Sequence, residues 1–249
     1  MILARVKSLR HPAPMNTLAN LPPKALVTGG NGNLGEAVAR LLLRSGFQVH
    51  VTVHDERTRA SFAYGLMKEG LNVHVADLTK PEDCERLAQE IGGHLEALVA
   101  TVGGFVAGPF AGIDPAAIDQ QYELNLKSTM LTLRYAYPLL AASPNGASVV
   151  LVANRPALTT GPNVAVTSAM KAAVVHLTRS LCAEWAEANI TINAIAPSVM
   201  DTPQNRRDMP DKDPTKWPTP LEVAEVIQFL LSDTGSIISG AVLPVYGKA

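Results

Sequence analysis

The chain has 249 residues, 47% of them hydrophobic, and a formal net charge of −1 at pH 7. This length fits one large α/β domain, and the scattered, balanced charge leaves no electrostatic footprint for nucleic acid or an anionic membrane surface. We therefore expect small molecules and further copies of the chain as partners, and no nucleic acid and no membrane.

The two cysteines, Cys84 and Cys182, offer neither a disulfide framework nor a metal site. They fit a reducing compartment, and we expect a cytoplasmic location. Residues 1–23 are basic, but four prolines would break the amphipathic helix of a transit peptide. We expect a flexible leader over residues 1–23 and a single domain over residues 24–249.

From Lys24 onward, short apolar runs alternate with helical patterns, which is typical of a parallel sheet covered by helices on both faces. The expected strands are Lys24–Thr28, Gln48–Val53, Asn72–Val75, Ala97–Thr101, Ala147–Ala153, Thr191–Ala196 and Ala241–Val245. The expected helices are Leu34–Ser45, Arg57–Glu69, Pro81–Ile91, Pro115–Ala142, Pro162–Ala188 and Leu221–Ser232. Pro203–Pro220 is expected to be a long functional loop with room for one short helix. The pattern predicts a doubly wound α/β fold of the Rossmann type with seven parallel strands.

A glycine-rich segment, residues 28–35 (TGGNGNLG), directly follows the first predicted strand and opens a predicted helix. Its glycines permit a tight turn, close approach to a pyrophosphate and close packing of helix on strand, while the helix N-terminus supplies amide donors. The strand before and the helix after make this pattern indicative of dinucleotide binding. The residues expected to hold the phosphates are Gly29, Asn31, Gly32, Asn33, Leu34 and Gly35.

The end of the second predicted strand bears on the choice of dinucleotide. NAD-binding proteins carry a ribose-binding acid there, and this chain has Val53 instead, with Asp55 two residues late. His54 and Arg57 could surround a 2′-phosphate. The sequence therefore favours NADP(H), and NAD(H) stays possible.

Thr167 and Lys171 are four residues apart, which places them on one face of a predicted helix. A tyrosine in the first position would become a usable proton donor beside the ammonium group, because the positive charge lowers the phenol pKa. A threonine hydroxyl does not titrate in that range, so the usual proton relay is missing.

With these residues in view, the chain resembles the short-chain dehydrogenases/reductases from about Lys24 to Gly247. The resemblance implies that Asn125 is a catalytic asparagine and that Lys171 also binds the ribose of the cofactor. It further implies cofactor contacts at Asp77, Leu78, Gly103, Pro197, Val199 and Thr202.

The resemblance also shows departures, because the family's Ser, Tyr and Lys fall on Asn154, Thr167 and Lys171. The pair Gly103-Gly104, followed by Phe105, looks most like the dihydropteridine reductases, which lack the serine but keep the tyrosine. Family resemblance points to a homodimer or homotetramer, and apolar residues on more than one face of the two longest predicted helices indicate the same.

We expect an NAD(P)-dependent oxidoreductase of this type with an atypical active site that acts on an activated, electron-poor small molecule. Its expected catalytic residues are Asn125, Asn154, Thr167 and Lys171, and no metal site is expected. Two alternatives stay open. One is a nucleotide-binding protein without redox turnover, and the other is a non-redox enzyme, such as a lyase or cyclase, that reuses the pocket.

Overall fold

The computed structural model of the protein describes residues 22–60 and 70–248. Most of the leader expected over residues 1–23 therefore lies outside the described residues. The same holds for most of the helix expected over Arg57–Glu69, of which residues 56–60 are described and are helical.

The seven expected strands form one parallel sheet in the order β3-β2-β1-β4-β5-β6-β7. Their bounds are Lys24–Thr28 (β1), Gln48–Val53 (β2), Asn72–Val75 (β3), Ala97–Ala100 (β4), Ala147–Val152 (β5), Ile190–Pro197 (β6) and Val242–Val245 (β7). From β1, the strands β2 and β3 follow on one side of the sheet. The chain then crosses to the other side of β1, where β4 to β7 follow in order. The strand order thus reverses between β1 and β4, and in such sheets ligands bind beside the carboxyl ends of the strands at this point.

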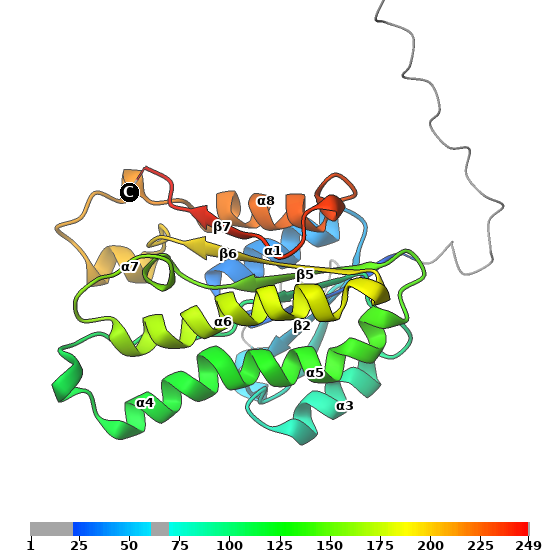
Figure 1. The fold of residues 1–249 in the computed structure, drawn as a ribbon, viewed down its shortest axis with the longest axis horizontal. Helices are drawn as coiled ribbons and strands as arrows, with labels where there is room; N and C mark the ends of the chain where they lie inside the picture. Colours follow the sequence, from blue (N-terminus) through cyan, green and yellow to red (C-terminus); the bar gives the residue numbers. More distant parts are fainter. Residues whose placement is uncertain (1–21, 61–69, 249) are drawn as a thin grey trace, which may run out of the picture.

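Helices cover both faces of the sheet (Figure 1). Their bounds are Asn33–Arg44 (α1), Pro81–Ile91 (α3), Pro115–Tyr122 (α4), Ser128–Ala141 (α5), Ala165–Glu184 (α6), Pro203–Asp208 (α7) and Pro220–Leu231 (α8). Strand residues alternate between the faces, because successive side chains of a strand point to opposite sides. In β1, Ala25 and Val27 pack with α1 and α8, whereas Leu26 packs with α3, α5 and α6. Two separate apolar layers therefore hold the sheet rigid beneath its carboxyl edge.

The structure corrects two expected elements and confirms a third with an added turn. The helix expected over Pro115–Ala142 is interrupted by a π-helix, Glu123–Lys127, between α4 and α5. The helix expected over Pro162–Ala188 begins only at Ala165, because Asn163 has a positive φ of 63°, and it ends in a short 3-10 turn, Ala186–Ala188. The expected loop Pro203–Pro220 contains α7 and a 3-10 turn, Pro214–Lys216.

Among the described residues, no helix combines the length and the apolar character needed to cross a bilayer. The same residues contain no group of three or more His, Cys, Asp or Glu side chains arranged to hold a metal ion.

Candidate active site

A cleft of about 580 Å³ lies at the carboxyl edge of the sheet, where the strand order reverses. Its walls come from the segments that follow β1, β2, β3 and β4, together with residues of the π-helix, α5 and α7. The predicted cofactor residues that line it are Gly29, Asn31, Gly32, Asn33, Leu34, Gly35, His54, Asp77, Leu78, Gly103 and Thr202. Residues far apart in the chain thus meet in one cavity large enough for a dinucleotide.

The glycine-rich loop fits a bound phosphate group. Gly29 has a positive φ of 66°, and a Cβ at Gly35 would overlap the carbonyl oxygen of Gly29, so both glycines serve the loop's own geometry. Gly32 differs, because its φ of −79° suits any residue and an added Cβ would meet only the Gly29 oxygen, at 3.4 Å. Helix α1 begins directly after Gly32, and the first amides of a helix have no partner within it. The start of α1 thus presents amides beside open space, an arrangement that suits an anion.

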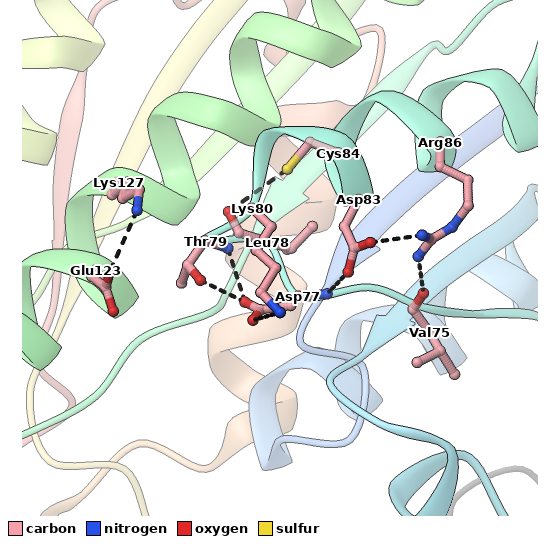
Figure 2. Close-up of polar contacts among 10 residues, drawn as sticks. All are labelled: Val75, Asp77, Leu78, Thr79, Lys80, Asp83, Cys84, Arg86, Glu123 and Lys127. Atoms are coloured by element: carbon pink, nitrogen blue, oxygen red, sulfur yellow. Dashed lines mark hydrogen bonds and ion pairs between the residues drawn. The ribbon is translucent and has the colours of Figure 1, made fainter.

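The far end of the cleft carries the Asp77 carboxylate, shown in Figure 2 between Thr79 and Lys80. Asp77 Oδ1 accepts hydrogen bonds from Thr79 N at 3.1 Å and Thr79 Oγ1 at 2.7 Å, and Lys80 Nζ lies 3.5 Å from Oδ2. Burial opposes ionisation of Asp77, but the hydrogen bonds from Thr79 and the charges of His54 and Lys80 outweigh it and lower its pKa. The amide of Asp77 donates to Asp83 Oδ2 at 2.8 Å. A fixed, ionised carboxylate therefore stands at this end.

Asp55, the acidic residue nearest the end of β2, binds a backbone amide outside the cleft. Asp55 accepts a hydrogen bond from Thr58 N at 2.7 Å at the start of the following helix, and this bond lowers its pKa. Asp55 does not line the cleft, whereas His54 does. Arg57 is exposed, does not line the cleft and makes no ion pair with a described residue. Among the described residues, Asp55 is thus held by Thr58, whereas His54 and Arg57 make no ion pair.

Lys171 lies directly behind the wall of the cleft. The residue is 7% exposed, and its ammonium group donates to the carbonyl of Val152 at 2.8 Å. A Cβ at Gly103, which lines the cleft, would lie 3.1 Å from Lys171 Nζ and 2.8 Å from Asn125 Oδ1. Burial lowers the pKa of Lys171 to about 8, because the low-dielectric surroundings disfavour the charged form. An ammonium group in this position can lose a proton near neutral pH.

The Thr167 hydroxyl belongs to a buried network behind the loop that follows β4. Thr167 Oγ1 accepts a hydrogen bond from Val106 N at 3.0 Å, and it lies 3.1 Å from two acceptors, Val106 O and Gln121 Oε1. The residue is 1% exposed and does not line the cleft. The hydroxyl therefore anchors this loop to α6, and its contacts are with the protein.

Asn125 joins the same network from the π-helix. Its Nδ2 donates to Gly104 O at 3.1 Å and to Gln121 Oε1 at 2.9 Å, and its Oδ1 accepts from Gly104 N at 3.2 Å. The buried Gln121 thus connects Asn125 to Thr167. Gln121 was not among the predicted residues, although its spacing of four from Asn125 on an expected helix was a usable signal. π-helical turns occur often at functional sites.

The remaining predicted residues lie around the ends of β5 and β6. Asn154 Oδ1 accepts from Ala157 N at 3.0 Å and caps the 3-10 turn Arg155–Ala157, which leaves its Nδ2 group without a partner among the described residues. Pro197 is buried and Val199 is 37% exposed, and neither lines the cleft. Thr202 lines the cleft and caps α7 through a hydrogen bond from Asn205 N at 3.1 Å.

Several lining residues were not predicted from the sequence. They support the expected ones from neighbouring strands: Thr52 Oγ1 accepts from Gly29 N at 3.1 Å, and Thr101 Oγ1 donates to Thr28 O at 2.6 Å. The lining residues that were not predicted as site residues are Thr52, Val53, Ala76, Thr79, Thr101, Val102, Leu124, Ser128, Met200, Gln204 and Asn205. Adjacency of strands, which the sequence alone does not give, brings most of them to the cleft.

Comparisons with known proteins agree with this geometry. The model of a family described as enoyl-(acyl carrier protein) reductase matches residues 30–247. A tropinone reductase homolog from Arabidopsis thaliana is 31% identical over 239 residues, which cover 90% of this chain and 89% of the relative.

Solved structures of other proteins show the same fold. A protein described as a short chain dehydrogenase/reductase family protein superimposes with a TM-score of 0.84 at 26% identity, covering 91% of this chain and 97% of its own. The structure of ElxO with NADP bound superimposes with a TM-score of 0.84 at 23% identity, covering 91% and 98% of the two chains, and shows the shared fold.

Proposed function

The chain belongs to the short-chain dehydrogenase/reductase family, and from that premise we propose that it is an NADP(H)-dependent oxidoreductase of an activated, electron-poor small molecule. The single observation that carries the proposal is the cleft itself, in which the glycine-rich loop, the start of α1 and Asp77 line one cavity. The ElxO structure, which has NADP bound, has the same fold and supports the choice of cofactor.

The residues of the cleft fit a dinucleotide. We propose that Gly32 and the first amides of α1 hold its diphosphate, that Asp77 and Leu78 contact the adenine, and that Lys171 holds the ribose next to the nicotinamide. When bound, the cofactor supplies the hydride. His54 and Arg57 favour a 2′-phosphate, because the two carboxylates that follow β2, Asp55 and Glu56, are held by Thr58 and Arg59.

Proton supply is the unusual part of the proposed reaction. The Thr167 hydroxyl is held by Val106 and Gln121, so we assign it the role of positioning the loop after β4, together with Asn125. The free Nδ2 group of Asn154 can donate a hydrogen bond to a substrate oxygen. Lys171, with its pKa lowered to about 8, can deliver the proton directly or through water.

This chemistry suits a substrate that accepts hydride readily, such as an iminium or quinonoid ring. A general acid typically raises the rate by about 10²- to 10⁴-fold. The missing phenol therefore slows the reduction of a simple ketone most. The likeness of the loop after β4 to dihydropteridine reductases supports a ring of this kind.

Consumption of NADPH against a panel of quinones, dihydropterins and simple ketones tests the proposal. We expect turnover of the electron-poor compounds and little turnover of unactivated ketones. We also expect kcat to fall about tenfold per pH unit above about 8, as Lys171 loses its proton. Ordinary rates with simple ketones would contradict the proposed acid chemistry. Tight NADPH binding without any turnover would identify a nucleotide-binding protein instead.

We further propose that the protein is a homodimer or homotetramer located in the cytoplasm. A groove of about 610 Å³ runs between α5 and α6 on the outer surface, and Met130 and Tyr137 on its rim are 47% and 38% exposed. An apolar groove of this kind suits burial against a second copy. Light scattering at micromolar concentration tests the assembly, and Met130→Glu should shift it toward the monomer.

The location is supported by two free cysteines, Cys84 and Cys182.

A further inference from the structure

Arg155 occupies the carboxyl edge of the sheet beside the proposed catalytic residues. It directly follows Asn154 at the end of β5, and its guanidinium carbon lies 4.8 Å from the ring centroid of Tyr246, which follows β7. Because β6 lies between β5 and β7, this contact passes over the end of β6. Pro197, one of the expected cofactor contacts, and Ser198 lie there.

The Arg155 guanidinium is a partly buried cation that lacks a polar partner. Among the arginines that the structure describes, those that are neither ion-paired nor hydrogen-bonded through the side chain are exposed, with Arg155 as the exception. Stacking on Tyr246 uses the flat face of the group. The five N–H donors lie in the plane of the guanidinium and are left free for a carboxylate-like anion. These nitrogens are not among the fully buried, unpartnered atoms of the described residues, so they are accessible to a ligand.

The contact is not needed to hold the two segments it joins. The backbone of Tyr246 is fixed by Ser198 Oγ, which donates to Tyr246 O at 2.9 Å, and Lys248 N donates to Lys216 O at 2.9 Å. On the other side, Asn154 already caps the turn that carries Arg155. Among the described residues, the charge of Arg155 is therefore not needed for an ion pair or a hydrogen bond that holds the fold.

The cofactor phosphates do not explain this cation either. The glycine-rich loop follows β1, and β4 separates β1 from β5, so Arg155 lies at the other end of the edge. We propose that Arg155, held by Tyr246, forms an anion-binding subsite for the substrate, which therefore carries a carboxylate or sulfonate group in addition to its reducible centre. This proposal rests on the proposed function for the identity of the ligand as a substrate.

Equilibrium binding provides a test that does not require turnover. Benzenesulfonate and its neutral isostere benzenesulfonamide are titrated into the full chain, with and without NADP⁺, by NMR or calorimetry. We expect wild-type protein to prefer the sulfonate by about 10- to 100-fold, since a charge-assisted pair with Arg155 is available to the sulfonate only. Arg155→Gln should abolish this preference, and Arg155→Lys should retain part of it.

Arg44→Gln is the matched control, because Arg44 is an exposed arginine in the last turn of α1, away from the carboxyl edge. It should leave the preference unchanged. Thermal unfolding of each variant shows whether the fold is intact. Equal binding of both probes by wild-type protein, or an unchanged preference in folded Arg155→Gln, would overturn the subsite.

A second arm separates this proposal from the proposed function. NADPH oxidation is followed with 4-formylbenzenesulfonate and 4-formylbenzenesulfonamide, two aldehydes with electron-withdrawing groups of similar size. We expect Arg155→Gln to raise KM for the sulfonate about 10-fold or more and to leave KM for the sulfonamide unchanged. If neither aldehyde nor any electron-poor compound of the panel is reduced, but the sulfonate preference in binding depends on Arg155, the oxidoreductase proposal fails and the anion subsite stands.

Discussion

The two ends of the carboxyl edge use their polar groups differently. At the end formed by β1 to β3, the glycine-rich loop and Asp77 face a cleft, and Gly32 lacks a side chain for no reason internal to the protein. At the other end, the polar side chains of two expected catalytic residues, Asn154 after β5 and Thr167 on α6, bond mainly to the protein itself. We call these the nucleotide end and the catalytic end: the expected binding residues of the first line the cleft, whereas the expected catalytic side chains of the second do not.

This difference separates the two parts of the proposed activity, which are binding of the cofactor and transfer of a proton. Binding of a dinucleotide needs amides and a fixed carboxylate, and these are in place. Proton transfer needs a group that titrates and reaches the substrate, and among the expected catalytic residues only Lys171 has a pKa moved to about 8. A substrate that needs little acid assistance is consistent with such a site.

The largest expected effect tests the nucleotide end. Gly32→Asp should weaken NADPH binding about 1000-fold, because a carboxylate placed at the start of α1 repels the diphosphate at a cost of several kcal/mol. Stability should change little, since the space beside Gly32 is open. Calorimetry measures the affinity, and Gly32→Ala is the control that adds the Cβ without the charge. Normal NADPH binding by Gly32→Asp would place the phosphates elsewhere.

A pair of histidines on β2 and β3, of which His50 is buried, predicts sensitivity to acid. His50 is 5% exposed, its Nδ1 lies 2.9 Å from His74 Nε2, and its Nε2 has no partner among the described residues. Burial, followed by the charges of His74 and Lys24, lowers the pKa of His50 to about 4. His74 in turn contacts Glu90, at 2.7 Å.

The unfolded chain binds a proton at His50 near pH 6.5, and the folded protein binds it only near pH 4. Stability is therefore complete above about pH 6.5 and is lost as the pH falls toward 4, by up to about 3 kcal/mol. Denaturant titrations across this range measure the loss. His50→Val should remove most of it, and His176→Val, at an exposed position on α6, should not. An unchanged acid slope in His50→Val would show that other groups cause it.

The next prediction concerns the catalytic end. Thr167→Val should destabilise the protein by about 2 kcal/mol, because the amide of Val106 loses its buried acceptor. Any NADPH-dependent turnover should stay within about threefold of the wild type. Thr167→Ser keeps the hydroxyl and is the control for stability. A variant Thr167→Val that is fully stable but loses turnover by about 100-fold would identify the hydroxyl as the proton donor.

The sequence predicted the sheet well because its signals are local. The strands β1, β2 and β3 have the predicted bounds, since each is a short apolar run closed by turn residues or a glycine-rich loop. The break at Glu123–Lys127 was not predicted, because the segment has the composition of a continuous helix. Its Asn125 side chain bonds to the backbone of Gly104, a tertiary contact that accompanies the π-helix and has no local signal.

The same distinction applies to the site. The glycine-rich loop could be located because strand, loop and helix are consecutive in the chain. The environment of Thr167 could not, because its partners Val106 and Gln121 are 61 and 46 residues away. The spacing of Thr167 and Lys171 predicts a shared helical face, and only the packing shows that one of them is held by the loop after β4.

The smallest expected effect tests whether the nucleotide end prefers NADPH to NADH. Arg57→Ala should weaken NADPH binding severalfold and leave NADH binding unchanged, because an exposed arginine contributes less than about 1 kcal/mol to a phosphate contact. Arg59→Ala is the matched control, since Arg59 lies 3.4 Å from Glu56 and has a partner already. Dissociation constants for both cofactors settle the point. Tighter binding of NADH than of NADPH by the wild type would mean that Asp55 gives up its hydrogen bond with Thr58 and reaches the ribose instead.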